Sequence, residues 1–319
     1  LKRILDVNPQ IVACDLHPDY ASTRYAREQE GIPCIAVQHH HAHIAACLAE
    51  NKTDGPVIGL SFDGTGLGTD GTIWGGEVLL ADIRGFTRAA HLSAVPMPGG
   101  AAAIREPWRM AVSHLRDAFG KDPDLVCLPH ADPGQARVLL QMMDKAVNSP
   151  LTSSLGRLFD AVAAIVGLRS KAAFEGQAAM ELEMIADAAE TAAYAFAWEG
   201  SGILHLATAP IIRSVTADAV QGTAPSIISA RFHNTLVALF DELCRHLRGA
   251  TGIDRVALSG GVFQNHRLLT GLSRALQNSG FDLLAHRLVP TNDGGLCLGQ
   301  AVVAAARAGS SGKGHDDDA

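Results

Sequence analysis

Alternating strand-like and helix-like segments at the two ends of the chain place the strongest constraint on its fold. Near the start, short apolar strands at residues 11–14 and 34–37 alternate with helical patterns at 20–29 and from the histidine run at 39–43 onward. Near the end, strands at 256–258 and 281–284 alternate with helices at 264–277 and 295–306. Strands that are joined through helices run parallel in one sheet. The sequence therefore predicts an α/β protein.

The middle of the chain follows a different pattern. Three strand-like runs at 57–62, 72–81 and 86–94 are joined by turns rich in Gly and Asp, which predicts an antiparallel meander. From Gly100 to about Ala250 the pattern is mostly helical, with apolar residues at a 3.6-residue period. We expect three parts: residues 1–52 as the remainder of a first lobe, 53–308 as a second lobe with a helical insertion at about 100–250, and 309–319 as a disordered tail.

A meander followed by strand, helix, strand, helix is the unit of the actin-like and sugar-kinase folds, in which two such lobes clasp a nucleotide. The second lobe has both parts, whereas the first lobe lacks its N-terminal β-meander in this sequence. A lobe without those strands exposes a sheet edge and apolar surface. We therefore expect a two-lobed nucleotide-binding fold with a first lobe that is truncated or is completed by another chain.

Charge and cysteine content exclude several classes of protein. The formal net charge of −7 disfavours a non-specific nucleic-acid binder, because phosphate neutralisation needs a basic face. No window resembles a signal peptide, and no apolar stretch reaches the roughly 18 residues of a membrane span. The six cysteines are dispersed without a Cys-x-x-Cys pair, which favours reduced thiols over a zinc ribbon. We expect a cytoplasmic protein with no membrane or nucleic-acid partner.

The run Gln38-His39-His40-His41-Ala42-His43 is the strongest candidate for a metal site. It lies where the strand at 34–37 passes into a helix, so His39 and His43 are one turn apart on the same face. Two imidazoles suit zinc, copper, iron or nickel and leave coordination positions for carboxylates and substrate. The alternative is a helix N-terminus with adventitious metal affinity. A one-residue shift of the helix start would make His40 or His41, in place of His39, the partner of His43.

Two glycine-rich turns at strand ends are candidate phosphate or nucleotide sites. In Ser61–Gly68, glycines allow backbone amides to approach a phosphate, Thr65 adds a hydroxyl, and Asp63 can hold a cation. The alternative is a hairpin turn that binds nothing. Ser259–Asn265 passes from a strand into a helix, the context in which amides and the helix dipole bind an anion, or else it is a plain turn capped by Ser.

Four further features of the sequence are candidates for a binding or packing role. Asp293, after the last strand, is either a helix cap or a ligand at the carboxyl end of the strands. Gly156 within an apolar helix indicates close approach by a partner. Asp160 can bind ribose hydroxyls or lie solvated on the helix surface. The stretch Arg105–Arg109 either binds an anionic substrate or forms an internal ion pair with Glu106.

Several sequence segments, taken together, resemble the carbamoyl-transfer domain of the HypF family, the carbamoyltransferases of hydrogenase maturation. The resemblance rests on DLHPDYASTRYA, QHHHAHIAA, SFDGTGLGTDGTIWGGE, REPWRMA, SSLGRLFDAVA, SGGVFQNHRLL and NDGGLCLGQA, in collinear order over nearly the whole chain. The family is related to the tRNA threonylcarbamoyl-transfer subunit and to antibiotic O-carbamoyltransferases. The resemblance implies that a carbamoyl-adenylate, formed from ATP, binds between the lobes beside iron or zinc, with Mg²⁺ as a further candidate cation.

The resemblance also implies roles for individual residues, each at its matching position. The implied metal ligands are His39, His43, Asp63 and Asp293. The implied nucleotide contacts are the phosphate loop Gly64, Thr65 and Gly66, the ribose side Asp160, Gly176 and Glu181, and the adenine side Gly260, Gly261 and Asn265. The nucleophile would come from the partner, because none of the cysteines of this chain lies in a matching motif. We therefore assign no catalytic residue.

The implied partner is a HypE-like protein, whose C-terminal cysteine accepts the carbamoyl group on the way to cyanide on the hydrogenase iron. Full-length family members carry upstream a YrdC-like domain that makes the adenylate, and this sequence does not contain it. Two other functions stay open. The chain could be an O-carbamoyltransferase for a small-molecule hydroxyl, or a non-catalytic nucleotide-binding fragment.

Overall fold

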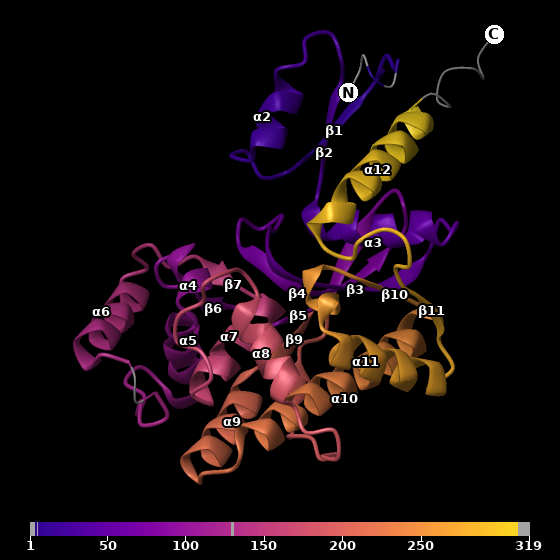
Figure 1. Ribbon diagram of the computed structural model, residues 1–319. Helices are drawn as coiled ribbons and strands as arrows, with labels where there is room; N and C mark the ends of the chain where they lie inside the picture. Colours follow the sequence, from indigo (N-terminus) through magenta and orange to yellow (C-terminus); the bar gives the residue numbers. More distant parts are fainter. Residues whose placement is uncertain (1–3, 5, 129–130, 312–319) are drawn as a thin grey trace, which may run out of the picture.

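The computed structural model describes residues 4, 6–128 and 131–311, which form a mixed α/β structure around one large sheet (Figure 1). The main path of this nine-stranded sheet runs β11-β10-β3-β4-β5-β9-β8, and β6 and β7 pair beside it. No helix in the described part of the chain has both the length and the apolar character needed to cross a membrane.

The centre of the large sheet is the predicted meander. Strands β3 (Val57–Leu67), β4 (Ile73–Ala81) and β5 (Phe86–Leu92) pair antiparallel in chain order, which confirms this prediction. The register of β3 with β4 shifts between Phe62 and Gly66, so the chain departs from regular pairing at the Gly-rich segment. Strand β10 (Arg255–Ser259) pairs parallel with β3, and β11 (Asp282–Leu284) pairs parallel with β10. The ends of β3 and β10 therefore lie side by side.

Alternating side chains of β3 divide the core between the two faces of the sheet. Ile58, Leu60 and Phe62 pack in a cluster with α5 (Pro107–Phe119), α7 (Leu155–Ile165), α10 (Pro225–Thr251) and α11 (His266–Asn278). Val57, on the opposite face, packs in a separate cluster with Ile44 of α3 (His39–Glu50). This two-residue period is that of a strand buried on both faces.

A smaller parallel sheet stands apart from the large one. Strand β1 (Val12–Asp15) pairs with β2 (Cys34–Val37), and α2 (Ala21–Arg27) connects them, as the alternation predicted. The last helix, α12 (Leu296–Ser311), lies beside this unit and packs on α3 (Figure 1). A side chain at Gly299 would collide with the carbonyl oxygen of Ala42, so glycine permits this close helix crossing.

The segment at 100–250 is helical with three short strands. Its helices are α4 (Ala102–Arg105), α5, α6 (Pro133–Asp144), α7, α8 (Gln177–Ile185), α9 (Ala209–Val220) and α10. Strand β7 (Leu151–Thr152) pairs with β6 (Val95–Pro96), whereas β9 (Leu204–Ala207) and β8 (Ala197–Glu199) extend the large sheet beyond β5. Strands of two to four residues are too short for an alternating pattern, which is why the sequence did not reveal them.

The predicted lobe boundary at 52 stays a prediction, because α3 contacts both the large sheet and α12. The predicted tail began too early. Helix α12 continues to Ser311, so residues 309–311 are helical, and the rest of the predicted tail, 312–319, lies outside the described residues.

Candidate metal and nucleotide site

The histidine run occupies the first turns of α3. Gln38 precedes the helix and caps it, because its side-chain oxygen accepts a hydrogen bond from the backbone N–H of His41 at 2.8 Å. The side-chain nitrogen of Gln38 also donates to the carbonyl oxygen of Leu67 at 3.1 Å, which ties the helix start to the end of β3. With the helix beginning at residue 39, His39 and His43 share one face, and their ring centroids lie 5.0 Å apart.

His39 and His43 meet two carboxylates from other elements. Asp63 comes from β3, and Asp293 comes from the short 3-10 turn η2 (Asp293–Gly295) after β11. The Nε2 of His39 lies 3.2 Å from Asp63 Oδ2 and 3.5 Å from Asp293 Oδ1. The Nε2 of His43 lies 3.6 Å and 3.4 Å from the same two oxygens. One donor atom from each of the four residues falls within 4.8 Å of every other, so the four can hold one cation.

The unpartnered Nε2 atom of His43 is independent evidence that these four residues fit a metal ion. Its imidazole is 1% exposed, yet Nε2 has no hydrogen-bond partner among the described residues. A buried polar atom without a partner costs free energy, and this one faces two carboxylate oxygens at distances longer than a hydrogen bond. Two nitrogens and two oxygens form a donor set for borderline cations such as Zn²⁺ or Fe²⁺.

We call His39, His43, Asp63 and Asp293 the His/Asp cluster. Nearby carboxylates control the protonation of its imidazoles. Burial lowers the pKa of His39, but its contacts with Asp15, Asp293 and Asp63 outweigh burial and raise the pKa well above 6.5. Burial raises the pKa of Asp63, but its contacts with His39 and His43 outweigh burial and hold that pKa well below 3.8. Contacts with His39 and His43 likewise lower the pKa of Asp293. Without a cation, protons on the imidazoles balance the negative charge.

Asp15 is a site residue that the sequence analysis did not single out. It ends β1, is 2% exposed, and its Oδ2 accepts a hydrogen bond from Nδ1 of His39 at 2.9 Å. This bond leaves Nε2 of His39 as the atom that faces Asp63 and Asp293. Carboxylates behind a ligating histidine commonly fix its tautomer and orientation in this way. The available signal was that an Asp ends the strand parallel to the one that leads into the histidine run.

A cavity of about 660 Å³ opens beside the His/Asp cluster. It shares Asp63 and Asp293 with the cluster, so the two form one continuous site. Six further residues that the sequence analysis predicted line it: Gly64, Thr65, Asp160, Gly176, Gly261 and Asn265. Five polar lining residues were not predicted as site residues: Arg157, Glu175, Glu183, Gln264 and Asn292.

The Gly-rich segment at 61–68 was predicted as a turn at a strand end, but β3 continues through it to Leu67 with a bulge between Phe62 and Gly66, which we call the Gly64 turn. Helix α7 packs directly on this bulge. A Cβ at Gly156 would lie 3.0 Å from Cα of Gly64, so the close approach predicted for Gly156 is confirmed. The hydroxyl of Ser154, which caps α7, lies 2.8 Å and 2.7 Å from the carbonyl oxygens of Asp63 and Gly64. These contacts fix the turn against the helix that carries Asp160. Burial raises the pKa of Asp160 to about 6 in spite of the nearby Arg157.

Asn265 lines the cavity, and two side-chain contacts hold it in place. Its Oδ1 caps α11 by accepting a hydrogen bond from Leu268 N at 2.8 Å, and its Nδ2 lies 2.9 Å from Nε2 of His233. Burial lowers the pKa of His233 to about 4, which keeps this ring neutral and able to accept. Beside it, the N–H of Gly261 donates to Asp63 Oδ1 at 3.1 Å, so the second Gly-rich turn also braces a cluster carboxylate.

Two predicted glycines lie behind the cavity wall. A Cβ at Gly66 would lie 2.6 Å and 2.7 Å from the rings of His40 and His39, so Gly66 makes room for the histidine helix. Gly260 has φ +108° and packs against the backbone of Phe62, where no other residue would fit. Their role in this structure is close packing, and neither reaches the cavity lining.

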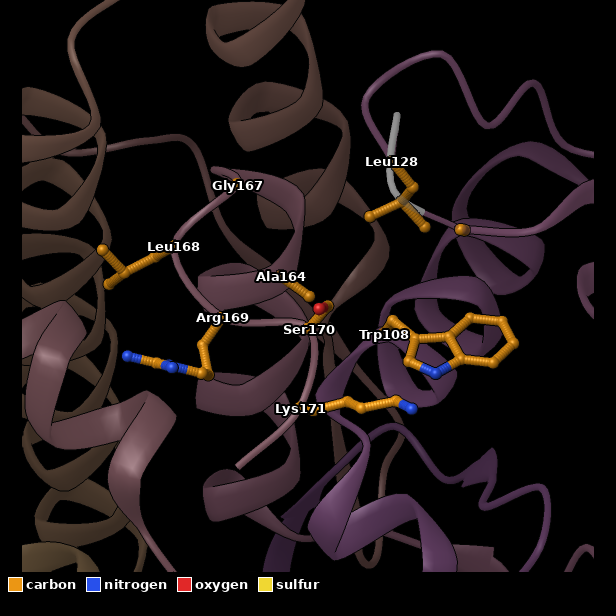
Figure 2. A pocket seen from close by; sticks show the side chains of 9 residues that line it. Trp108, Leu128, Ala164, Gly167, Leu168, Arg169, Ser170 and Lys171 are labelled. Atoms are coloured by element: carbon orange, nitrogen blue, oxygen red, sulfur yellow. The ribbon is translucent and has the colours of Figure 1, made fainter. Parts of the chain in front are cut away.

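Glu181 also lies outside the large cavity. Its carboxylate pairs with Arg169, with Oε2 2.8 Å from the arginine Nε. Arg169 borders a second cavity, of about 330 Å³, where its side chain and that of Lys171 extend in opposite directions (Figure 2). Trp108 lines the same cavity, and Arg109 forms an ion pair with Glu106. For the Arg105–Arg109 stretch, the structure thus contains the internal ion pair.

The sequence of this chain is similar to that of known carbamoyltransferases. Residues 1–50 match the family described as the HypF Kae1-like domain, and residues 59–300 match that described as "Carbamoyltransferase, Kae1-like Domain, second subdomain". Carbamoyltransferase HypF2 of Cupriavidus necator is 42% identical over 97% of this chain and 41% of its own length. A Carbamoyltransferase HypF homolog of the same organism is 38% identical over 93% of this chain and 78% of its own length.

Solved structures show the same likeness. Full-length HypF, in a phosphate- and nucleotide-bound form, superposes with a TM-score of 0.91 at 42% identity over 95% of this chain and 48% of that one. HypF of T. kodakarensis gives 0.83 at 30% identity over 93% of this chain and 40% of that one. The chain spans about two fifths of the length of the first curated relatives it matches. It belongs to the HypF carbamoyltransferase family, matches that family's Kae1-like domain, and has the actin-like fold of that domain.

Proposed function

We propose that this chain transfers a carbamoyl group from carbamoyl-adenylate to the C-terminal cysteine thiol of a HypE-like partner, a step toward the cyanide ligands of NiFe hydrogenase. The observation that carries the proposal is the continuity of the His/Asp cluster with the large cavity through Asp63 and Asp293. The relatives, which are named carbamoyltransferases, indicate which group is transferred.

The cavity has the size and the polar groups that a nucleotide needs. Its volume of about 660 Å³ lies within the roughly 300–1,000 Å³ of small-molecule sites. Backbone amides at Gly64 and Thr65 would receive the phosphate, because a glycine turn lets the main chain approach an anion closely. Asp160 and Gly176 would face the ribose, and Gly261 and Asn265 would face the adenine.

His39, His43, Asp63 and Asp293 would hold an iron or zinc ion. Such an ion, or a Mg²⁺ bound with the nucleotide, would supply Lewis-acid polarisation of the phosphate or carbamoyl oxygens. The chain itself contributes orientation and exclusion of water. Asp15 keeps Nε2 of His39 directed at the cluster, and the burial of both imidazoles limits competing hydrolysis.

The partner would supply the nucleophile. Among the described residues, none of the six cysteines lines the cavity. Burial raises the pKa of Cys47 to about 12 and that of Cys127 to about 11, so these thiols stay protonated. In the transfer, the thiolate of the partner forms a C–S bond with the carbamoyl carbon while the bond to the phosphate oxygen breaks. AMP leaves with the electron pair, and the thiol proton passes to solvent.

A transfer assay tests this function. The metal-loaded chain is mixed with a HypE-like protein, and carbamoyl-adenylate is generated by an added YrdC-like domain from carbamoyl phosphate and ATP. Mass spectrometry of the intact partner should show one carbamoyl group, which is absent when the C-terminal cysteine is replaced by serine. The double variant His39→Ala/His43→Ala should lose the transfer while keeping its fold.

The outcomes also separate the two other functions. Carbamoylation of an added small-molecule alcohol, with none of the partner, would favour an O-carbamoyltransferase. Nucleotide binding by the folded chain without transfer to either acceptor would favour a non-catalytic nucleotide-binding role. Either result would overturn the proposed function.

A further inference from the structure

Arg157 differs from every other charged residue of the large cavity. Among the described lining residues it alone carries a cationic side chain, whereas five carry carboxylates: Asp63, Asp160, Glu175, Glu183 and Asp293. A phosphate that enters so acidic a cavity meets repulsion unless a cation receives it. Asp63 of the His/Asp cluster directly precedes Gly64, and Arg157 comes from the helix that packs on the Gly64 turn.

The hydrogen-bonding capacity of the Arg157 guanidinium is largely unused. The residue is 3% exposed, and its Nε lies 2.7 Å from Oδ2 of Asp160. That contact balances charge but is poorly aligned, and both Nε and Nη1 lack a hydrogen-bond partner among the described residues. A guanidinium has five N–H donors in a fixed fork, and burying them unpaired costs free energy. The arrangement is that of a donor set prepared for an acceptor.

The position of Arg157 identifies where that acceptor would lie. The cap of α7, Ser154, contacts the carbonyl oxygens of Asp63 and Gly64, so α7 starts at the glycine turn. The Nη2 of Arg157 is 3.9 Å from where a Cβ of Gly64 would be, and Glu175 Oε1 is 3.6 Å from the same point. No ion pair joins Arg157 to Glu175 in the described part of the chain, although both approach this turn. The guanidinium therefore borders the space beside the amides of Gly64 and Thr65.

We propose that Arg157 binds a phosphate oxygen of the nucleotide at the Gly64 turn and stabilises the charge of the AMP leaving group. The inference rests on the proposed function and names a residue for its leaving-group step. As the carbamoyl carbon forms its bond to the acceptor sulfur, the electron pair of the broken C–O bond stays on the phosphate oxygen. Arg157 is fixed beside that position before the charge develops, which is the arrangement that stabilises a transition state.

Asp160 has a supporting role in this arrangement. Its carboxylate lies beside Nε, which is buried together with Nη1, and leaves Nη2, the terminal nitrogen nearest the Gly64 turn, for the ligand. The competing explanation is that Arg157 acts only through Asp160, by orienting that carboxylate toward the ribose. The two explanations differ in one measurable respect: a phosphate contact distinguishes AMP from adenosine, whereas a ribose contact affects both ligands equally.

Calorimetric titrations of AMP and of adenosine into the metal-loaded chain separate these explanations. In Arg157→Gln, we expect AMP affinity to fall about tenfold to a hundredfold, the usual worth of a charge-assisted hydrogen bond, with adenosine affinity nearly unchanged. Arg157→Lys should fall between Arg157→Gln and wild type for AMP, because it keeps the charge and loses the fork. Arg169→Gln, whose arginine pairs with Glu181 outside this cavity, is the matched control and should leave both affinities unchanged.

Each outcome decides the proposal. Equal losses for AMP and adenosine would assign Arg157 to the ribose through Asp160, and no loss for either would remove it from the site. If Arg157→Gln fails to fold, Arg157→Lys decides alone, since an AMP affinity equal to that of wild type would exclude a forked phosphate contact. Wild-type protein that binds neither ligand would overturn the proposed function itself, together with this inference.

Discussion

The two faces of helix α3 present the same residue type to opposite environments. His39 and His43 face Asp63 and Asp293, and the pKa of each imidazole is raised. On other sides of the same helix, His40 lies beside Trp74 and His41 beside Phe86, and burial lowers the pKa of both imidazoles. All four rings are almost completely buried.

Burial alone does not decide the charge of a histidine in this helix. Desolvation is the largest influence on all four pKa values and lowers each of them. Only the carboxylates near His39 and His43 reverse its direction. The face with carboxylates is therefore suited to a cation, and the face without them serves packing. Four substitution and pH experiments test whether metal binding depends only on the carboxylate face.

The largest effect is expected from removing both imidazoles of the carboxylate face. His39→Ala/His43→Ala takes away two of the four donors, so affinity for Zn²⁺ or Fe²⁺ should fall by at least about a thousandfold. Competition with a chelator of known affinity measures the change. An affinity close to that of wild type would show that the cation binds elsewhere and would break the distinction between the faces.

Asp15→Asn should produce the next largest effect, although Asp15 does not face the cation. An amide can accept from Nδ1 of His39 but carries no charge, so the imidazole is a weaker ligand. Loss of such a supporting carboxylate commonly lowers metal affinity by about 10- to 100-fold. Asp19→Asn is the matched control, because Asp19 is exposed on the segment that follows β1. Equal effects of the two changes would mean that Asp15 acts through general charge.

Metal affinity should also rise with pH, by about tenfold per unit for each proton displaced. A cation can bind only imidazoles that have lost their Nε2 proton, and the pKa of His39 is held well above 6.5. The rise should therefore continue above pH 6.5 and level off once His39 is neutral. In Asp15→Asn the plateau should begin at lower pH, since a major cause of the raised pKa is gone. A pH-independent affinity in wild type would show that no proton is displaced.

Much of the fold could be predicted because long segments have strong periods. The meander and the helices at 155–165 and 225–251 have enough apolar residues in phase for the pattern to be unambiguous. The pairing of β9 with β5 could not be predicted, since β9 has four residues and joins β5 across more than a hundred positions of sequence. The crossing of α12 over α3 depends on the contact of Gly299 with Ala42, which no local pattern reveals.

Site residues that follow strand ends could be predicted from the sequence. Site residues whose role depends on the direction of a side chain could not. Asp63 follows the strand predicted at 57–62, and Asp293 follows the last predicted strand, so their meeting at one edge of the sheet could be expected. Which histidine accompanies His43 depended on where α3 begins, and the cap by Gln38 fixes this at His39. Arg157 was missed because an arginine on an amphipathic helix is ordinarily a solvated residue. Its burial follows from the packing of α7 on the Gly64 turn.

The smallest change in metal affinity is expected at the packing face. His41 Nε2 lies 2.7 Å from the carbonyl oxygen of Asp82, and its ring lies 5.1 Å from that of Phe86. In His41→Ala, the loss of this hydrogen bond and of buried ring contacts should lower the free energy of unfolding by about 1–3 kcal/mol. Metal affinity should stay within about threefold of wild type, because no cluster carboxylate contacts His41. Thermal unfolding and chelator competition on one preparation measure both quantities. A loss of metal affinity comparable to that of Asp15→Asn would show that the two faces of α3 are coupled through the helix. The two faces would then differ only in the protonation of their histidines.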